Sequence, residues 1–329
     1  MQKKNRNKIL NFLLKLFLVL LFLVFLYRQV FFKNDPQVLL SEFLRSLGSQ
    51  NFLLFLLAFC LALINWSLEA LKWKLLMSPY KHYNFFTSVK TIFSGIAAGI
   101  ITPLQLGEYF GRVAVIDQEQ KWRSLWATLT GSIAQNIFTV FAGISGFLYI
   151  LRHSYNVDNF ILLPSLLLGI AGVILLLVLY YNLGFALKLA SKLNMKKLIA
   201  RIKRSGIHPE YNSFLLNKVL ILSCLRYIVF TTQFCLMLIF FGLDMNIIAL
   251  ISGVSTVFLL QTGIPLPPAA NFIARGGLAI LIFSQNGANE IMILSSTFSL
   301  WFINLVIPSL IGLLILMKEN IVKNLGYDD

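Results

Sequence analysis

GIAAGIITPLQLGEYFGR, residues 95–112, and LLQTGIPLPPAANFIARGG, residues 259–277, are apolar stretches broken in the middle by proline and glycine. They lie in longer apolar segments, 90–116 and 247–285, at matching places in the two halves of the chain, and each carries an arginine beyond its break. A broken helix frees backbone groups that only protein or a wet cavity can satisfy inside a membrane. Paired interrupted segments are typical of transporter binding sites. The predicted breaks are at Pro103, Gly107, Pro265, Pro267 and Pro268.

The composition places this chain in a membrane. Hydrophobic residues make up 58% of its 329 residues, charged residues make up 12%, and the mean hydropathy is +0.78. A water-soluble protein of this size could not hide so many apolar side chains in its core. We therefore predict an all-α integral membrane protein. Its full transmembrane helices, each at least about 20 residues long, are expected at residues 9–32, 50–76, 124–150, 160–183, 213–241 and 289–317.

The first of these spans has the features of a retained anchor. Basic residues precede it, as they precede a secretory signal, but its apolar run is long and is interrupted by Lys15. Because no small-residue cleavage site follows before Asp35, we expect the segment to stay in the membrane.

Basic residues indicate which polar segments face the cytoplasm. Lysine and arginine are frequent in the N-terminus, in residues 72–90 and above all in residues 184–212, whereas the predicted loops 33–49 and 151–159 are nearly neutral. Cytoplasmic segments carry the excess of positive charge. Four full spans already return the chain to the cytoplasm at residues 184–212. The segment 90–116 must then enter from the cytoplasm and return as a re-entrant helical hairpin.

The same reasoning is weaker for 247–285, because the charges of the C-terminal tail nearly balance. As a hairpin entering from the outside, this segment gives a cytoplasmic C-terminus and two oppositely oriented repeat units, 1–159 and 160–329. We thus predict about six full spans and two re-entrant hairpins in an inverted repeat, with the site where the hairpins meet near the midplane. In the alternative, proline and glycine only kink ordinary helices.

Several polar side chains inside the predicted spans are candidates for that site. Arg226 lies near the centre of its span, where a charge costs about 2.5–3.5 kcal/mol on insertion scales, so it should face protein or water. Gln233 shares its helical face, and Trp301 and Asn304 share one face of the last span. For the amides, the alternative is ordinary hydrogen bonding between helices.

The charge balance of these segments indicates what the site binds. The deep cations are Arg112, Arg226 and Arg275. Their only deep acidic partners are Glu69 and Glu108, and Glu69 lies about a turn from the cytoplasmic end of its span, where it could simply pair with Lys72 or snorkel. A guanidinium matches phosphate or carboxylate in geometry and charge, so the surplus predicts an anionic, phospholipid-like headgroup. In the alternative, Glu108 pairs with an arginine across the hairpins and locks the fold.

Metal, cofactor and nucleic-acid functions have no support in the sequence. The three cysteines fall inside spans and the three histidines lie far apart in loops, so no metal site is expected. Without a Gly-rich phosphate loop or a hydrolytic constellation, we expect neither a cofactor nor enzymatic activity. The net charge of +15 is spread over membrane-flanking segments, which argues against nucleic acid as a partner. The basic segment 184–212 either lies on anionic lipid as an amphipathic helix or only sets the orientation.

Four stretches resemble the flippase-like transmembrane region of lysylphosphatidylglycerol synthases, a region that stand-alone bacterial membrane proteins share. They are Trp73 with its basic neighbours, TPLQLGEYFGR (102–112), LRYIVFTTQF (225–234), and the Pro-rich second hairpin followed by WFINLVIPSLIG (301–312). Taken in order, they cover nearly the whole chain.

The resemblance implies that a lipid headgroup moves between the leaflets of a bacterial cytoplasmic membrane. The residues at matching positions are Glu108, Arg112, Arg226 and Arg275. Two departures concern their polar partners: members commonly carry an acidic residue at the position of Asn271, and an acidic or basic pair at those of Gln135 and Asn136. The family's aminoacyl transferase activity resides in a separate soluble domain, which we do not expect after Met317.

Two functional hypotheses follow. In the first, the protein translocates an anionic phospholipid or a lipid-linked headgroup between leaflets. In the second, it is a non-transporting membrane scaffold for an envelope lipid or glycan enzyme, which would contact the basic segment. Both hypotheses leave homo-oligomerisation open. The residues predicted to bind substrate are Glu69, Glu108, Arg112, Arg226, Gln233, Arg275, Trp301 and Asn304.

Overall fold

The computed structural model describes residues 13, 36–47, 51–100, 102, 106–182, 211–262, 271–284 and 288–319. All regular elements in this part of the chain are helices, so the all-α prediction is confirmed. They are α2 (Pro36–Leu47), α3 (Phe52–Met77), α4 (Phe85–Gly99), α5 (Leu106–Val113), the 3-10 turn η2 (Gln118–Gln120), α6 (Lys121–His153), α7 (Asn159–Tyr181), α10 (Ser213–Phe240), α11 (Ile247–Thr262), α12 (Asn271–Phe283), α13 (Glu290–Trp301), the π-helical turn η4 (Phe302–Val306) and α14 (Ile307–Lys318).

Five helical stretches are long and apolar enough to cross a membrane. They are α3, α6 with η2, α7, α10, and the continuous run from α13 to α14. Their bounds agree within six residues with the last five predicted spans, which confirms a multi-pass membrane protein. The predicted span 9–32, apart from residue 13, and most of the basic segment 184–212 lie outside the described residues.

Residues 33–49, which were predicted to form a loop, contain helix α2. The prediction was wrong because the apolar residues of this segment recur at helical spacing and have a surface to pack against. The Phe43 ring lies 5.3 Å from the Phe55 ring and 6.3 Å from the Phe240 ring. With 12 residues, α2 is about 18 Å long, which is too short to cross a bilayer.

The first broken segment forms the helical hairpin of α4 and α5. These helices have 15 and 8 residues and are therefore about 22 and 12 Å long, too short to span about 30 Å of hydrocarbon. The loop before α4 and the loop after α5 meet through an ion pair of 2.5 Å between Lys81 Nζ and Asp117 Oδ2. This contact with Lys81 lowers the pKa of Asp117. Both ends of the hairpin thus lie on one side, as predicted for a re-entrant segment.

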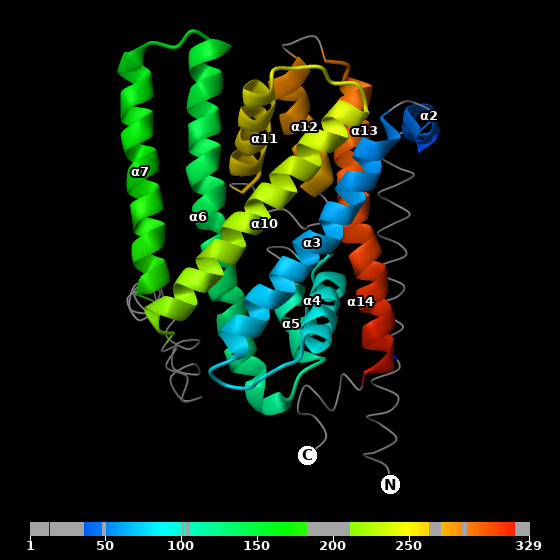
Figure 1. Cartoon of the computed structure of the whole chain (residues 1–329), viewed down its shortest axis with the longest axis vertical. Coiled ribbons are helices and arrows are strands. Elements are labelled where there is room, and N and C mark those ends of the chain that lie inside the picture. The colour runs from blue at the N-terminus through cyan, green and yellow to red at the C-terminus, as the bar shows by residue number, and fades with distance from the viewer. Residues whose placement is uncertain are drawn as a thin grey trace.

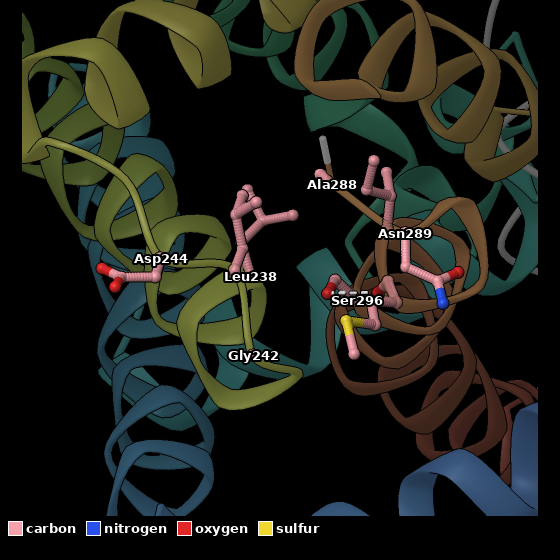
Figure 2. A pocket seen from close by; sticks show the side chains of 9 residues that line it. Leu238, Gly242, Asp244, Ala288, Asn289 and Ser296 are labelled. Carbon is pink, nitrogen blue, oxygen red and sulfur yellow. Dashed lines mark hydrogen bonds between the residues drawn. The ribbon is translucent and has the colours of Figure 1, made fainter. Parts of the chain in front are cut away.

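The second broken segment forms the hairpin of α11 and α12, which has the opposite orientation. Gly242 and Asp244 before α11, and Ala288 and Asn289 after α12, line the same cavity (Figure 2). Both ends of this hairpin therefore lie together. Figure 1 shows α4 and α5 at the lower end of the molecule and α11 and α12 at the upper end. The chain thus turns back into the protein from two opposite sides.

Packing between the two halves is reciprocal. The central helices α3 and α10 pack extensively on each other, α4 of the first hairpin packs on α14, and α11 of the second hairpin packs on α6. Glycine permits the close approach in both cases: a Cβ at Gly312 would overlap the carbonyl oxygen of Phe93, and one at Gly143 would overlap Leu259. Small residues serve this purpose at helix interfaces in membranes. An inverted repeat produces this pattern; the unit bounds 1–159 and 160–329 stay a prediction.

Gly107 has a different role from the predicted helix break. It is the second residue of α5, and its N–H donates a hydrogen bond of 2.7 Å to Thr102 Oγ1 across the turn. A Cβ at Gly107 would overlap the carbonyl oxygen of Ala98, and one at Gly111 would overlap that of Ser94. The GxxxG spacing of these glycines therefore lets α5 lie against α4. The predicted breaks at prolines 103, 265, 267 and 268 lie outside the described residues.

A single methyl group should test this packing. We expect Gly312→Ala to destabilise the protein by about 1–3 kcal/mol, because the backbone of α4 must move to make room. The matched control is Gly172→Ala on α7, where no atom lies within 4 Å of the added Cβ. It should be neutral or slightly stabilising, since alanine favours helix more than glycine does. Melting temperatures of the purified variants in detergent measure both effects, and equal melting temperatures would contradict the packing.

Candidate functional site

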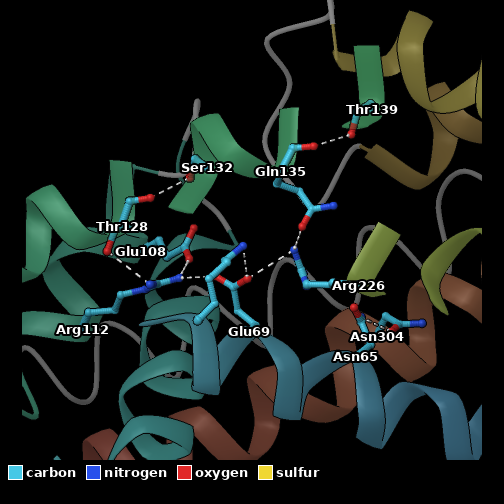
Figure 3. A network of polar contacts seen from close by, with 11 residues as sticks. Asn65, Glu69, Glu108, Arg112, Thr128, Ser132, Gln135, Thr139, Arg226 and Asn304 are labelled. Carbon is cyan, nitrogen blue, oxygen red and sulfur yellow. Dashed lines mark hydrogen bonds and ion pairs between the residues drawn. The ribbon is translucent and has the colours of Figure 1, made fainter. Parts of the chain in front are cut away.

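Glu69 on α3 is the centre of a buried charge cluster (Figure 3). Its Oε2 lies 2.7 Å from Lys72 Nζ, one turn further along the same helix, and 3.4 Å from Arg226 Nη1 on α10. Its Oε1 lies 3.5 Å from Arg112 Nη2 on α5. Only 12% of the Glu69 side chain is exposed. One carboxylate thus faces three cations from three different helices.

Arg112 is held from several sides. Glu108, one turn earlier on α5, forms an ion pair with its Nη2 atom, while Nη1 donates a hydrogen bond of 3.2 Å to Thr128 Oγ1 on α6. Gly95 on α4 leaves room for the stem, since a Cβ there would lie 2.8 Å from Arg112 Cγ. The Arg112 side chain is 3% exposed and that of Glu108 is 20% exposed. The cluster therefore reaches the surface at Glu108 rather than at Arg112.

Arg226 connects the cluster to α6 as well as to α3. Its Nη1 donates a hydrogen bond of 3.3 Å to Gln135 Oε1, and its guanidinium lies over the Trp66 ring, 5.5 Å from the centroid. A second amide contact lies nearby, one turn before Glu69 on α3: Asn65 Nδ2 donates a hydrogen bond of 3.1 Å to Asn304 Oδ1 in η4 (Figure 3). Three full spans and the first hairpin thus position the charges.

The cluster has an excess of positive charge. Its cations are Lys72, Arg112 and Arg226, and its carboxylates are Glu69 and Glu108. One positive charge therefore has no carboxylate of its own. Buried N–H donors without a partner among the described residues lie on its arginines and on the neighbouring ring: Arg112 Nε, Arg226 Nε and Trp66 Nε1. Since buried polar groups normally have partners, an anion with several acceptor oxygens would satisfy both the charge and the donors.

Lys72 is a member of the cluster that the sequence reasoning missed as a site residue. It was assigned to the basic cytoplasmic segment 72–90, but its side chain is 3% exposed and it belongs to α3. Glu69 does not snorkel, since it is buried and shared by three cations. The i, i+3 spacing of Glu69 and Lys72 within an apolar helix was the signal that pointed to this pair. Burial of both charges is possible because each compensates the other.

Other predicted site residues lie outside this cluster. Gln233 Nε2 donates a hydrogen bond of 2.8 Å to the carbonyl of Ala58 and so ties α10 to α3. Trp301 packs on Phe272, with ring centroids 5.2 Å apart. Arg275 contacts Gln261 and two aromatic rings in the second hairpin.

The two hairpins consequently do not share one site through their arginines. The first hairpin supplies Glu108 and Arg112 to the cluster, and full spans supply the other charges. The ion pair of Glu108 is formed with Arg112 of its own helix, so the alternative in which Glu108 pairs across the hairpins is wrong.

A cavity of about 340 Å³ lies at the opposite end of the molecule, between the C-terminal end of α10 and the start of α13 (Figure 2). Its walls are largely apolar, with Leu238 and Met292 among them, and Ser296 in its wall donates a hydrogen bond of 3.2 Å to the carbonyl of Met237. None of the charged residues of the Glu69 cluster lines it. We therefore place the candidate site at the cluster.

The chemistry available at the cluster is recognition of an anion. Within the described residues, no three His, Cys, Asp or Glu side chains are grouped to hold a metal ion. The polar groups are guanidinium, ammonium and amide donors, and the two carboxylates are occupied by cations.

Comparison with known proteins agrees with this architecture. The family model described as the lysylphosphatidylglycerol synthase TM region matches residues 12–312, most of the chain. The chain belongs to this family. Membership of the lysylphosphatidylglycerol synthase TM region family implies a membrane protein associated with lipid modification or transport. No curated protein matches the chain significantly. The Glu69 cluster is thus a feature of this chain's TM region, formed by α3, α5, α6 and α10.

Proposed function

We propose that this protein translocates an anionic phospholipid or a lipid-linked headgroup between the leaflets of a bacterial cytoplasmic membrane, with both termini in the cytoplasm. Membrane lipids are its partners in this proposal, and no enzymatic step is required. The observation that carries it is the buried cluster in which Lys72, Arg112 and Arg226 outnumber Glu69 and Glu108.

The chemistry of the cluster supports exchange of one anion for another. An arriving phosphate offers oxygens that can replace the carboxylate oxygens of Glu69 and Glu108 at the arginine forks. The longer contacts, 3.4 Å from Arg226 and 3.5 Å from Arg112 to Glu69, are the weaker ones. The side chains of Glu108 and Arg226 are each 20% exposed, which supports access of a headgroup to them.

The opposed hairpins support movement across the membrane. The site of an inverted-repeat transporter lies between elements that open toward opposite sides in turn. In this chain α4 and α5 enter from one end and α11 and α12 from the other (Figure 1). Rocking of one hairpin against the central pair α3 and α10 would expose the cluster to one leaflet at a time.

Lipid flipping in reconstituted vesicles tests this proposal. The purified full chain is placed in liposomes that carry fluorescent phosphatidylglycerol or fluorescent phosphatidylcholine, and a membrane-impermeant reductant bleaches the outer leaflet. We expect the protein to make inner-leaflet phosphatidylglycerol accessible faster than phosphatidylcholine, because the cluster attracts net negative charge. Protein-free vesicles are the control. If the folded protein flips neither lipid, the translocase proposal fails and a scaffold for an envelope enzyme becomes the better hypothesis.

A further inference from the structure

Arg275 on α12 has no carboxylate partner among the described residues. It is the only charged residue in the sequence between Asp244 and Glu290. Its Nε donates a hydrogen bond of 3.0 Å to Gln261 Oε1, and its guanidinium lies 5.4 Å and 5.5 Å from the ring centroids of Phe230 and Phe258. The residue is half-buried, and its Nη atoms have no hydrogen-bond partner in the described part of the chain.

Arg275 corresponds in position to Arg112 of the first hairpin. Each lies in the second helix of its hairpin, and each follows a polar residue by four positions: Glu108 precedes Arg112, and Asn271 precedes Arg275. The surroundings differ in charge. Arg112 contacts two carboxylates, whereas Arg275 contacts one amide and two aromatic rings.

Contacts of the central helices support this correspondence. On α3, Asn65 bonds to Asn304 of the last span, and Glu69 one turn later faces Arg112. On α10, Arg226 bonds to Gln135 of α6, and Phe230 one turn later faces Arg275. The carboxylate that compensates the arginine of the first hairpin is thus replaced by an aromatic ring in the second.

Two rings and one amide leave the Arg275 charge under-compensated. A cation over an aromatic face gains about 0.5–2 kcal/mol, whereas a charge at membrane depth costs about 2.5–3.5 kcal/mol on insertion scales. The two rings lie near the guanidinium carbon and offer no hydrogen-bond acceptor, so within the described residues only Nε has one, in Gln261. The Nη donors of a guanidinium are the groups that bind phosphate or carboxylate through two parallel N–H bonds.

We propose that Arg275 forms a second anion-binding site, separate from the Glu69 cluster, that takes the phosphate group of an anionic lipid through its Nη atoms. Gln261 holds the guanidinium at Nε, and Phe230 and Phe258 pack near its central carbon. Because α11 and α12 enter from the end opposite to α4 and α5, this site serves the leaflet that the first hairpin does not face. The assignment of the anion to a lipid rests on the proposed function; the anion site itself does not.

Equilibrium binding to the purified full chain in neutral detergent tests the site. Native mass spectrometry counts bound molecules of dioctanoyl phosphatidylglycerol, and a titration gives the affinity of each. We expect two bound lipids for the unmodified protein and one for Arg275→Gln. The variant Arg226→Gln should also bind one lipid, and the double variant Arg226→Gln, Arg275→Gln should bind none. Lys218→Gln, which removes an exposed charge from α10, should bind as the unmodified protein does.

A second variant separates loss of the site from loss of the fold. Gln261→Glu places a carboxylate where the amide now contacts Arg275. This variant should preserve the melting temperature and weaken the affinity for the second lipid by more than about tenfold. If Arg275→Gln and Gln261→Glu both bind two lipids with unchanged affinity, the inference is overturned.

Inorganic phosphate alone identifies the source of the anion. If inorganic phosphate at an equal concentration displaces the second lipid, the site exists and its ligand is a free anion. If the lipid stays bound, the ligand is a lipid headgroup. These measurements are independent of transport. A protein that binds at Arg275 but flips no lipid in vesicles would support this inference while the proposed function fails.

Discussion

Replacement of Glu69 by glutamine is expected to have the largest effect on stability. Removing one partner from a buried ion cluster typically costs about 3–5 kcal/mol, because the charges left behind have lost their compensation. Here Lys72, Arg112 and Arg226 would keep only Glu108, which contacts Arg112 alone. We expect Glu69→Gln to lower the melting temperature by about 5–10 °C and to reduce the yield of folded protein in detergent.

The double variant Glu69→Gln, Lys72→Met is the control for this interpretation. It removes the carboxylate together with its closest cation and so restores the charge difference of the cluster. We expect it to regain most of the lost stability. Glu119→Gln, which removes an exposed carboxylate from η2, should leave the melting temperature unchanged. If Glu69→Gln has the same melting temperature as the Glu119→Gln control, the cluster contributes little to the stability of the protein.

Replacement of Arg226 by glutamine is expected to have the largest effect on transport. Without Arg226 the cluster has two cations and two carboxylates, so the attraction for an anion disappears while the remaining charges stay paired. Charge-assisted hydrogen bonds contribute about 1.5–3 kcal/mol, which corresponds to a roughly 10- to 100-fold slower flipping of phosphatidylglycerol. The fluorescent-lipid assay in vesicles measures this rate, and melting temperature verifies the fold.

Two variants sharpen the test of Arg226. Lys218→Gln removes the same charge from the same helix, but at an exposed position over the Phe214 ring, and should flip lipid at the normal rate. Arg226→Lys keeps the charge and loses the planar fork, so an intermediate rate is expected. Equal rates of lipid flipping for Arg226→Gln and Lys218→Gln would show that Arg226 has no role in transport.

Much of the fold could be predicted because its signals are local. Each of the five spans seen in the structure is a continuous apolar run, and a run of that length can only be a helix in a membrane. The hairpins followed from proline and glycine inside short apolar segments, combined with the count of basic loops. Helix α2 was not predicted because its segment is short and nearly neutral, as a loop would be; its Phe43 packs on Phe55 of a helix that follows in the sequence.

The site was predicted less completely because its contacts are distant in sequence. Glu108, Arg112 and Arg226 were identified as charges too costly to bury without purpose. Their grouping with Lys72 and the separation from Arg275 depend on which helix faces lie opposite each other. The sequence does not indicate that arrangement. A lysine near a helix end, such as Lys72, is therefore predicted to flank the membrane.

The sequence by itself determined that this chain is an all-α membrane protein, that two apolar segments are interrupted, and that arginine outnumbers acid in its deep positions. The length of an apolar run, the helix breakers and the loop charge are each properties of one segment, so each can be recognised directly in the sequence. Only the tertiary structure decided that Glu69 is shared by three cations while Arg275 lies against two aromatic rings. These contacts depend on the packing of α3 against α10 and of one hairpin against each of them. The partner of a buried charge is whichever side chain the neighbouring helix brings within a few ångströms.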